Sequence, residues 1–369
     1  GLLSGGRRAA APLTPVALVL HLVPAPGLAN GRVRRGRERV DPPNRDRRDT
    51  RRRLWTCGGA STISPRMHDI TQADQAADAA PVRAALALAG GNAEDPRVRA
   101  ALAGIMGLVR ATADPPDFDA ARTLRPDLPK RPVNDAPVGL IIETRRHRNL
   151  PFVVRQVTSF CDIPVQVMHG PGNAHFVNER LADLIAEGRV VPTALGGNRL
   201  NGRAFNGLLL DRAFWDTMIG RGKILMFQTD SMLCRKSKYQ LADFLEFDFI
   251  GSRLPTGRAK GCGLIYNSMN GGLSVRDWNR STAALERFPP DKWPSGEDAF
   301  FSFFVEADGG RVGAGADCDR FCGQRWFKRG CFGLHKPRFH DPRLFTSILR
   351  YEPNAWRLVG PVERRLARG

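Results

Sequence analysis

The chain has 369 residues, of which 42% are hydrophobic and 25% are charged, and its formal net charge is +19. A hydrophobic share of this size excludes a chain that is disordered throughout. The length is enough for one large domain or two ordinary ones.

The positive charge is concentrated at the start of the sequence. Residues 1–55 carry 13 arginines and four acidic residues, a net charge of +9, which leaves +10 for the other 314 residues. That moderate excess fits an anionic small molecule such as a nucleotide as well as it fits nucleic acid.

Residues 1–65 are predicted to be disordered, because they offer few apolar side chains to bury. Residues 9–29 are apolar and follow Arg7 and Arg8, as in a signal peptide, but prolines and a histidine interrupt them and argue against a transmembrane helix. An Arg-rich targeting segment is the alternative. The sequence does not decide whether the protein belongs to the secretory pathway (including the Golgi) or to the cytoplasm.

Two regions of different composition follow. Residues 66–112 are Ala-rich and show helical spacing with Pro near the start and Gly near the end of each pattern, which predicts a short helical segment. Residues 113–137 are rich in Pro and Asp and are predicted to be a linker.

From residue 138 onward, short apolar runs alternate with helical patterns. The predicted strands are 138–143, 164–169, 189–195 and 223–228, and the predicted helices between them are 150–161, 176–188 and 203–220. This alternation predicts an α/β fold with a mainly parallel sheet. Ligands of such sheets bind beyond the carboxyl ends of the strands, which places Glu143–Arg145, His169–Gly172 and Gln228–Ser231 along one functional edge.

The polar turn Gln228-Thr229-Asp230-Ser231 directly follows the strand 223–228. Asp230 at such a strand end can bind a divalent cation that carries phosphate oxygens, because hard cations prefer oxygen ligands. The alternative is that Asp230 only caps the turn through its own backbone.

Two later segments are further candidates. Asn270-Gly271-Gly272 permits positive φ angles and close approach to a ligand, or it forms a plain β-turn. Ser295 is predicted to cap a helix whose first turn holds Glu297 and Asp298. These two acids either complement the helix dipole or act as a general base toward an acceptor hydroxyl.

The seven cysteines have no regular framework. Cys318, Cys322 and Cys331, with His335 or His340 as a fourth ligand, could be nominated as a zinc site, but free thiols with at most one disulfide fit the spacing better. His335, which is followed by Lys336, is either a metal ligand or a structural histidine.

Five segments form a pattern when they are taken in sequence order: QTDS (228–231), FDFIGS (247–252), NGGLSVR (270–276), GEDAFFS (296–302) and FGLHKP (332–337). It resembles a family of glycosyltransferase-like domains of unknown function related to GT-A enzymes. The segments IIETRRHRNLPFVVRQ and VQVMHGPGNAHFV are similar to the first two strand–helix units of that family. The resemblance covers residues 138–340 and implies a GT-A-like domain there, with residues 341–369 as a C-terminal tail.

The resemblance also implies roles for individual residues. Asp230 is expected to bind a divalent cation, Mn²⁺ or Mg²⁺, on the donor diphosphate, although Gln228 replaces the first acid of the Asp-x-Asp motif. Glu143, Thr144 and Arg145 match the nucleobase and ribose site, and Glu297 and Asp298 match the acid pair that faces the acceptor. His335 and Lys336 match a pair that closes over metal and diphosphate.

The leading hypothesis is therefore transfer of a sugar from a nucleotide-sugar donor to a hydroxyl of a glycan, protein or small-molecule acceptor, by an inverting or a retaining route. The alternatives are a nucleotide-sugar hydrolase or nucleotidyltransferase on the same fold, and a non-catalytic fold that has lost the first acid. Nucleic-acid binding through the basic arm is the least supported, because no RRM, KH or zinc-finger pattern accompanies the arm.

Overall fold

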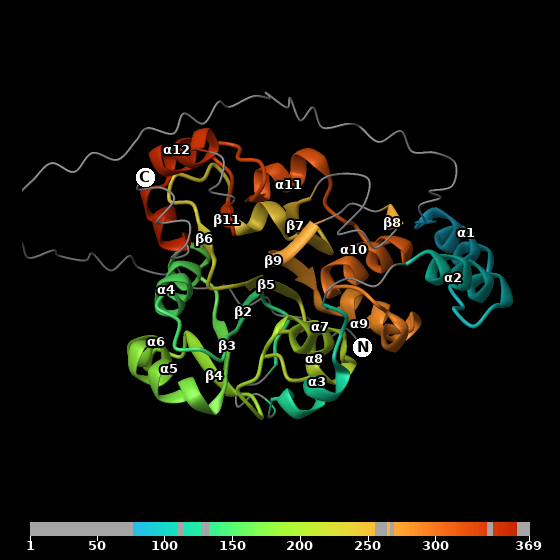
Figure 1. Cartoon of the computed structure of the whole chain (residues 1–369), viewed down its shortest axis with the longest axis horizontal. Coiled ribbons are helices and arrows are strands. Elements are labelled where there is room, and N and C mark those ends of the chain that lie inside the picture. The colour runs from blue at the N-terminus through green and yellow to red at the C-terminus, as the bar shows by residue number, and fades with distance from the viewer. Residues whose placement is uncertain are drawn as a thin grey trace, which may run out of the picture. The chain divides into compact units, whose positions relative to one another are not determined.

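A computed structural model describes most of the chain from residue 77 onward (Figure 1). The described residues are 77–109, 114–126, 128, 133–254, 264–265, 269–337 and 342–359. The chain divides into residues 1–67 and 68–369, and every described residue belongs to the second unit. The predicted disordered segment 1–65 and its apolar stretch therefore lie outside the described residues.

The central feature is a six-stranded mixed sheet with the strand order β4-β3-β2-β5-β9-β7. Its strands are β2 (Val138–Ile142), β3 (Val165–His169), β4 (Val190–Ala194), β5 (Lys223–Phe227), β7 (Phe249–Arg253) and β9 (Met269–Asp277). Strands β4, β3, β2 and β5 are parallel, whereas β9 is antiparallel to both β5 and β7. The predicted α/β class is confirmed.

Helices cover the sheet because its strands are apolar on both faces: every residue of β2 and β3 is buried. Helix α4 packs on β2 and β3, and α10 packs on β7 and β9 and against α7 and α9. The helices between β2 and residue 322 are α4 (Leu150–Cys161), α5 (Ala174–Arg180), α6 (Ala182–Ala186), α7 (Gly202–Leu210), α8 (Arg212–Trp215), α9 (Trp278–Arg287), α10 (Glu297–Ala307) and α11 (Gly315–Phe321). Single turns of 3₁₀ helix lie at 171–173, 241–244 and 290–292.

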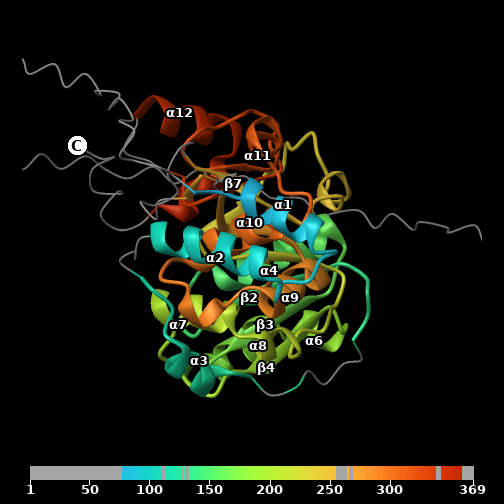
Figure 2. The same cartoon turned by 90° about the vertical axis from the view of Figure 1, so that its right-hand side faces the viewer.

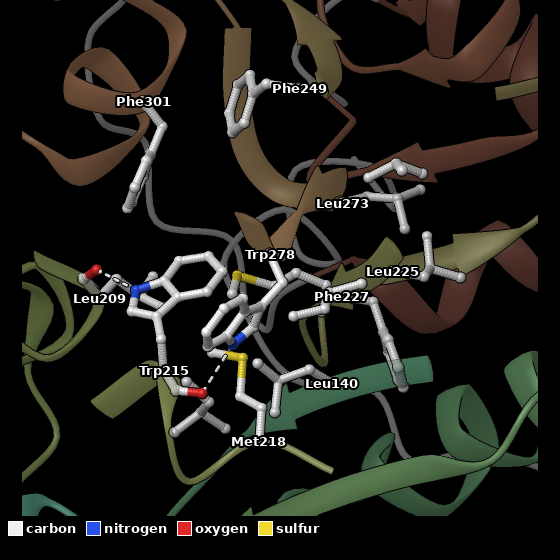
Figure 3. Packing of buried hydrophobic residues seen from close by; sticks show 14 of the residues in the cluster. Leu140, Leu209, Trp215, Met218, Leu225, Phe227, Phe249, Leu273, Trp278 and Phe301 are labelled. Atoms are coloured by element: carbon white, nitrogen blue, oxygen red, sulfur yellow. Dashed lines mark hydrogen bonds between the residues drawn. The ribbon is translucent and has the colours of Figure 1, made fainter. Parts of the chain in front are cut away.

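Two buried tryptophans anchor the core between the sheet and these helices (Figure 3). The indole nitrogen of Trp278 donates to the Trp215 carbonyl over 2.9 Å, and that of Trp215 donates to the Leu209 carbonyl over 2.8 Å. The ring of Phe301 from α10 meets Trp215 edge-on. Each polar indole atom therefore has a partner, as burial requires.

The helical segment predicted before the sheet is present as α1 (Ala80–Leu88) and α2 (Pro96–Leu108). They lie together beside α10, as both views show (Figures 1 and 2). A short pairing of β1 (Ala77–Asp78) with β8 (Leu264–Ile265) accompanies them. No helix in the described part of the chain is long and apolar enough to cross a membrane.

Two predicted boundaries differ from the structure. The linker 113–137 contains helix α3 (Phe118–Leu124), which Asp117 caps by accepting from the Ala120 amide and which packs on α7. The tail 341–369 contains α12 (Pro342–Tyr351) and a 3₁₀ helix, η5 (Pro353–Leu358). Ile348 and Ala355 of these elements are buried in a small cluster with Met232 and Leu334, so the domain extends past residue 340.

A small second sheet joins distant parts of the sequence. Its strands are β6 (Ser231–Leu233), β10 (Cys322–Gly323) and β11 (Gly333–His335) in the order β10-β11-β6. Strand β11 is antiparallel to β6, with His335 opposite Ser231 and Gly333 opposite Leu233. This pairing brings the FGLHKP segment onto the QTDS turn at the end of β5.

Candidate functional site

The turn Gln228–Ser231 is held by the serine. The Ser231 hydroxyl donates to the Gln228 carbonyl over 2.6 Å, and the Ser231 amide donates to the same oxygen over 3.0 Å. Asn149 supports the turn from behind by donating to the Thr229 carbonyl over 3.1 Å. Because these bonds close the turn, the Asp230 carboxylate is not needed as its cap.

Asp230 instead faces His335. Asp230 Oδ1 lies 3.3 Å from His335 Nε2, and the Lys336 amide donates to the Asp230 carbonyl over 2.8 Å. Lys336 adopts a left-handed φ of 40°, an uncommon conformation for a residue with a side chain, and it ends β11 at this point. The turn and the strand end therefore meet through their backbones as well as through the acid and the imidazole.

The facing atoms of Asp230 and His335 are buried but incompletely satisfied, although the Asp230 side chain as a whole is 37% exposed. His335 is 2% exposed, and neither of its ring nitrogens nor Asp230 Oδ1 has a well-oriented hydrogen-bond partner among the described residues. Burial raises the pKa of Asp230, but the His335 contact and the nearby Lys336 charge outweigh it and hold the pKa below its usual value. A charged oxygen and an imidazole nitrogen thus converge without a full set of partners.

The Asn270-Gly271-Gly272 segment differs from both predictions. It is neither a turn nor a stretch of positive φ, because it lies inside β9 where the pairing with β7 is irregular. A Cβ built on Gly272 would lie within 3.0 Å of both His335 Nε2 and Gln228 Oε1. One on Gly271 would lie within 3.0 Å of Arg276 Nη2. The glycines therefore leave room for the polar side chains of the site.

We expect Gly272→Ala to push His335 and Gln228 apart. It should weaken the cation-dependent nucleotide binding that the resemblance implies more than it lowers stability. The reason is that the added methyl group meets polar side-chain ends and not a tightly packed apolar core. Titration calorimetry and thermal unfolding would separate the two effects. Gly104→Ala is the matched control, because a Cβ there meets nothing within 4 Å. Unchanged binding by Gly272→Ala would mean that the close packing at this glycine has no role in the site.

Glu143 lies at the end of β2, and its carboxylate accepts several hydrogen bonds. Its carboxylate accepts from the Arg145 side chain over 2.8 and 2.7 Å and from the Thr229 hydroxyl over 3.2 Å. The Arg145 amide also donates to it over 2.8 Å. Glu143 therefore fixes Arg145 and links the end of β2 to the end of β5. Thr144, predicted to act with them, is buried and does not line the neighbouring pocket.

A pocket of about 490 Å³, which we call the sheet-end pocket, opens at these strand ends. Its polar lining includes Glu143, Arg145, Gln228 and Asp230, and Gly296 lines it at the start of α10. The strand order changes direction here, since β3 and β4 follow β2 on one side and β5 lies on the other. Open α/β sheets bind ligands at such a switch point, and the volume suits a small molecule.

Glu297 and Asp298 directly follow Gly296 in the chain but do not line this pocket. Both oxygens of Glu297 accept from the fully buried Arg276, Nη1 to Oε2 over 2.6 Å and Nη2 to Oε1 over 3.2 Å. Asp298 is also buried, and its Oδ1 accepts from the Ala299 amide over 2.9 Å. The predicted Ser295 cap is wrong: Gly296 is the N-cap residue, and the buried Ser295 hydroxyl has no hydrogen-bond partner among the described residues.

Several lining residues were not predicted from the sequence. Leu200, Asn201, Phe205 and Asn206 enter the sheet-end pocket from the start of α7, and Asp114 enters from before α3. Asn206 joins these parts by donating to the Asp114 carbonyl over 2.7 Å and accepting from the Glu297 amide over 3.4 Å. The asparagines before and inside α7 could have indicated these pocket residues, because Asn is unusual within a helix.

The described residues contain no group of three His, Cys, Asp or Glu side chains that could hold a metal. They do contain the pair Asp230 and His335, whose facing atoms lack well-oriented partners, with Gln228 Oε1 beside the imidazole. Such a donor set fits a divalent cation that takes its remaining ligands from phosphate oxygens and water. The residues present thus fit the expected cation only together with a phosphate-bearing ligand.

The five described cysteines are free thiols. Cys234 and Cys331 are buried and their sulfur atoms lie 4.0 Å apart. Burial raises the pKa of Cys318 to about 12, so this thiol stays protonated at neutral pH. His335 faces Asp230 and not these sulfurs, and His340 lies outside the described residues, so the nominated zinc set is not assembled in the described part of the chain.

Part of the chain matches a family model. A family model described as a protein of unknown function (DUF5672) matches residues 198–336. The match contains Gln228–Ser231, Asn270–Gly272, Glu297, Asp298 and the His335–Lys336 end of β11, but not Glu143–Arg145. No curated protein matches the chain.

Proposed function

We propose that this protein transfers a sugar from a nucleotide-sugar donor to an acceptor hydroxyl, on a fold related to GT-A glycosyltransferases. The observation that carries the proposal is the unsatisfied Asp230–His335 pair at the edge of the sheet-end pocket. A buried carboxylate oxygen and a buried imidazole that lack full partners are unfavourable unless a ligand completes them. A cation with a diphosphate is the ligand that the resemblance implies.

The sheet-end pocket suits the uncharged, hydroxyl-rich parts of such a donor. Asn201, Asn206 and Gln228 supply amide groups, and the Glu143 carboxylate could accept from hydroxyls. Leu200 and Phe205 provide an apolar wall against which a base or a sugar ring can pack. Arg145 is held at the rim by Glu143, in reach of a charged group.

Asp230 and His335 would hold the cation, and Lys336 lies next to them on the exposed side. When bound, the cation would neutralise charge that grows on the diphosphate leaving group. The chain's own contribution is to position these groups. The β6–β11 pairing fixes His335 against the turn, and Ser231 keeps the turn in shape.

For an inverting transfer the base must be a carboxylate close to the acceptor. Glu297 is a poor candidate because the Arg276 guanidinium occupies both of its oxygens. We therefore assign the role to Asp298, at the start of α10 where Gly296 opens to the pocket. A local rearrangement on acceptor binding would have to expose this buried acid.

Asp298→Asn is expected to lower turnover by about 10²–10⁴-fold, the usual contribution of a general base. Donor binding should stay within a factor of two or so of the parent, since the residue does not line the sheet-end pocket. Single-turnover transfer and donor titration on the same preparation would measure both. Normal turnover in this variant would leave a retaining route, or no transfer at all.

The proposal itself is tested by a screen of the full-length chain against a panel of nucleoside diphosphate sugars. Thermal unfolding is followed with and without manganese. A donor that raises the melting temperature only with manganese supports the proposal, and product analysis then distinguishes transfer from hydrolysis. If no donor shifts the transition under either condition, the proposal is wrong.

A further inference from the structure

A second pocket lies on the other side of Asp230. Its volume is about 440 Å³, and it shares only Thr229 and Asp230 with the sheet-end pocket. We call it the arginine pocket; its lining residues are Arg146, His147, Arg148, Asn149, Thr229, Asp230 and residues 357–359. The loop after β2 thus forms one wall, and the end of η5 forms the other.

The charge of this pocket differs from that of its neighbour. Three arginines line the arginine pocket, and Asp230 is the single acid among its described lining residues. The sheet-end pocket has the reverse balance, with Asp114, Glu143 and Asp230 against Arg145 alone. A neutral, hydroxyl-rich group is therefore favoured on one side of Asp230 and an anion on the other.

Contacts position two of these arginines, and none of the three forms an ion pair with an acid among the described residues. Arg146 donates to the Gly172 carbonyl over 3.2 Å, and Arg357 lies over the Phe152 ring with its guanidinium carbon 4.7 Å from the centroid. Asn149 ties the two walls together, since its side chain donates to the Thr229 carbonyl over 3.1 Å and to the Arg357 carbonyl over 3.0 Å. The backbone that carries the charges is thus fixed before any ligand arrives.

The pocket also continues outward. A further hollow of about 380 Å³ shares Arg148, Asn149 and Arg357 with it and ends beside Trp356. A ligand held by these arginines therefore has space beyond them, away from the sheet-end pocket. Planar guanidinium groups match the oxygens of phosphate, which makes phosphate the anion that this lining suits.

We propose that the arginine pocket is a phosphate-binding subsite in which Arg148 and Arg357 hold a phosphate-bearing group beside Asp230. The inference deepens the proposed function, because the phosphate would belong either to the donor diphosphate or to a phosphorylated acceptor. Its own evidence, the charge and shape of the pocket, does not depend on sugar transfer.

Inorganic pyrophosphate, titrated into the full-length chain by calorimetry, is the probe. Arg148→Gln and Arg357→Gln should each weaken its binding by about tenfold, the usual effect of losing one charge-assisted hydrogen bond. Both side chains are exposed, so folding should be preserved, and thermal unfolding checks this. Arg350→Gln removes an equally exposed arginine that lines neither pocket and should bind as the parent does.

The source of the phosphate is settled in a second titration with uridine or guanosine diphosphate. Competition with pyrophosphate assigns the arginine pocket to the donor, and simultaneous binding assigns it to the acceptor. Parent-like pyrophosphate binding by both arginine variants, or no pyrophosphate binding by the parent, would overturn the subsite. A protein that binds pyrophosphate through these arginines but transfers no sugar would retain the subsite and lose the proposed function.

Discussion

Asp230→Asn is expected to weaken cation-dependent nucleotide binding strongly while the fold stays nearly as stable as the parent. Asparagine keeps the size of the side chain, and the turn is closed by Ser231, so little of the local structure depends on the charge. The charge is what a hard cation requires. Loss of one of two protein ligands should weaken binding by at least about tenfold to a hundredfold, the range for disturbing a metal site.

The measurement is titration of a nucleoside diphosphate with manganese, beside thermal unfolding. Asp291→Asn is the matched control, because Asp291 is exposed and lies in a 3₁₀ turn away from both pockets. Gln228→Asp is the converse change and should strengthen the metal dependence by adding an acid at the strand end. Parent-like binding by Asp230→Asn would return this acid to a structural role.

Glu297→Gln should be the most destabilising of these substitutions. It removes the carboxylate that faces Arg276, a side chain with 0% exposure that lies between the rings of Phe249 and Phe301. Breaking a buried ion pair from one side typically costs about 3–5 kcal/mol. In a chain of this size the melting temperature should fall by about 10 °C.

Thermal and urea unfolding of the variant and of a paired replacement would measure this. Arg276→Met with Glu297→Met removes both charges, and we expect it to be more stable than Glu297→Gln alone. Asp298→Asn keeps the Arg276 pair and should lower stability less. If Glu297→Gln unfolds at the parental temperature, the ion pair does not stabilise the domain and Glu297 regains its place as a candidate base.

The architecture could be predicted because its signals are local. The buried runs around Ile141, Val167 and Leu225 are short and apolar, and each became a strand of the central sheet. Helices follow the first two runs, and helices precede the third. Helix 176–188 is in fact two helices that meet at Leu181, whose φ of −123° interrupts the pattern. The spacing of apolar residues identifies such a segment as helical but does not reveal a local break in the helix.

The site was harder to predict because its contacts are not local. Asp230 and His335 are far apart in the sequence and meet only through the β6–β11 pairing. Arg276 belongs to a strand pattern in which nothing marks it as the partner of Glu297. The glycines at 271 and 272 were singled out for backbone freedom, whereas in the structure they leave room for neighbouring polar side chains.

The most direct test of the central claim is manganese binding to the full-length chain, followed by electron paramagnetic resonance with and without a nucleoside diphosphate. Two protein ligands alone should bind the ion weakly, and the diphosphate should complete its coordination. We predict that the nucleotide tightens manganese binding at least about tenfold in the parent and has little effect in Asp230→Asn. Equal manganese binding by parent and variant, in the presence of the nucleotide, would contradict the account.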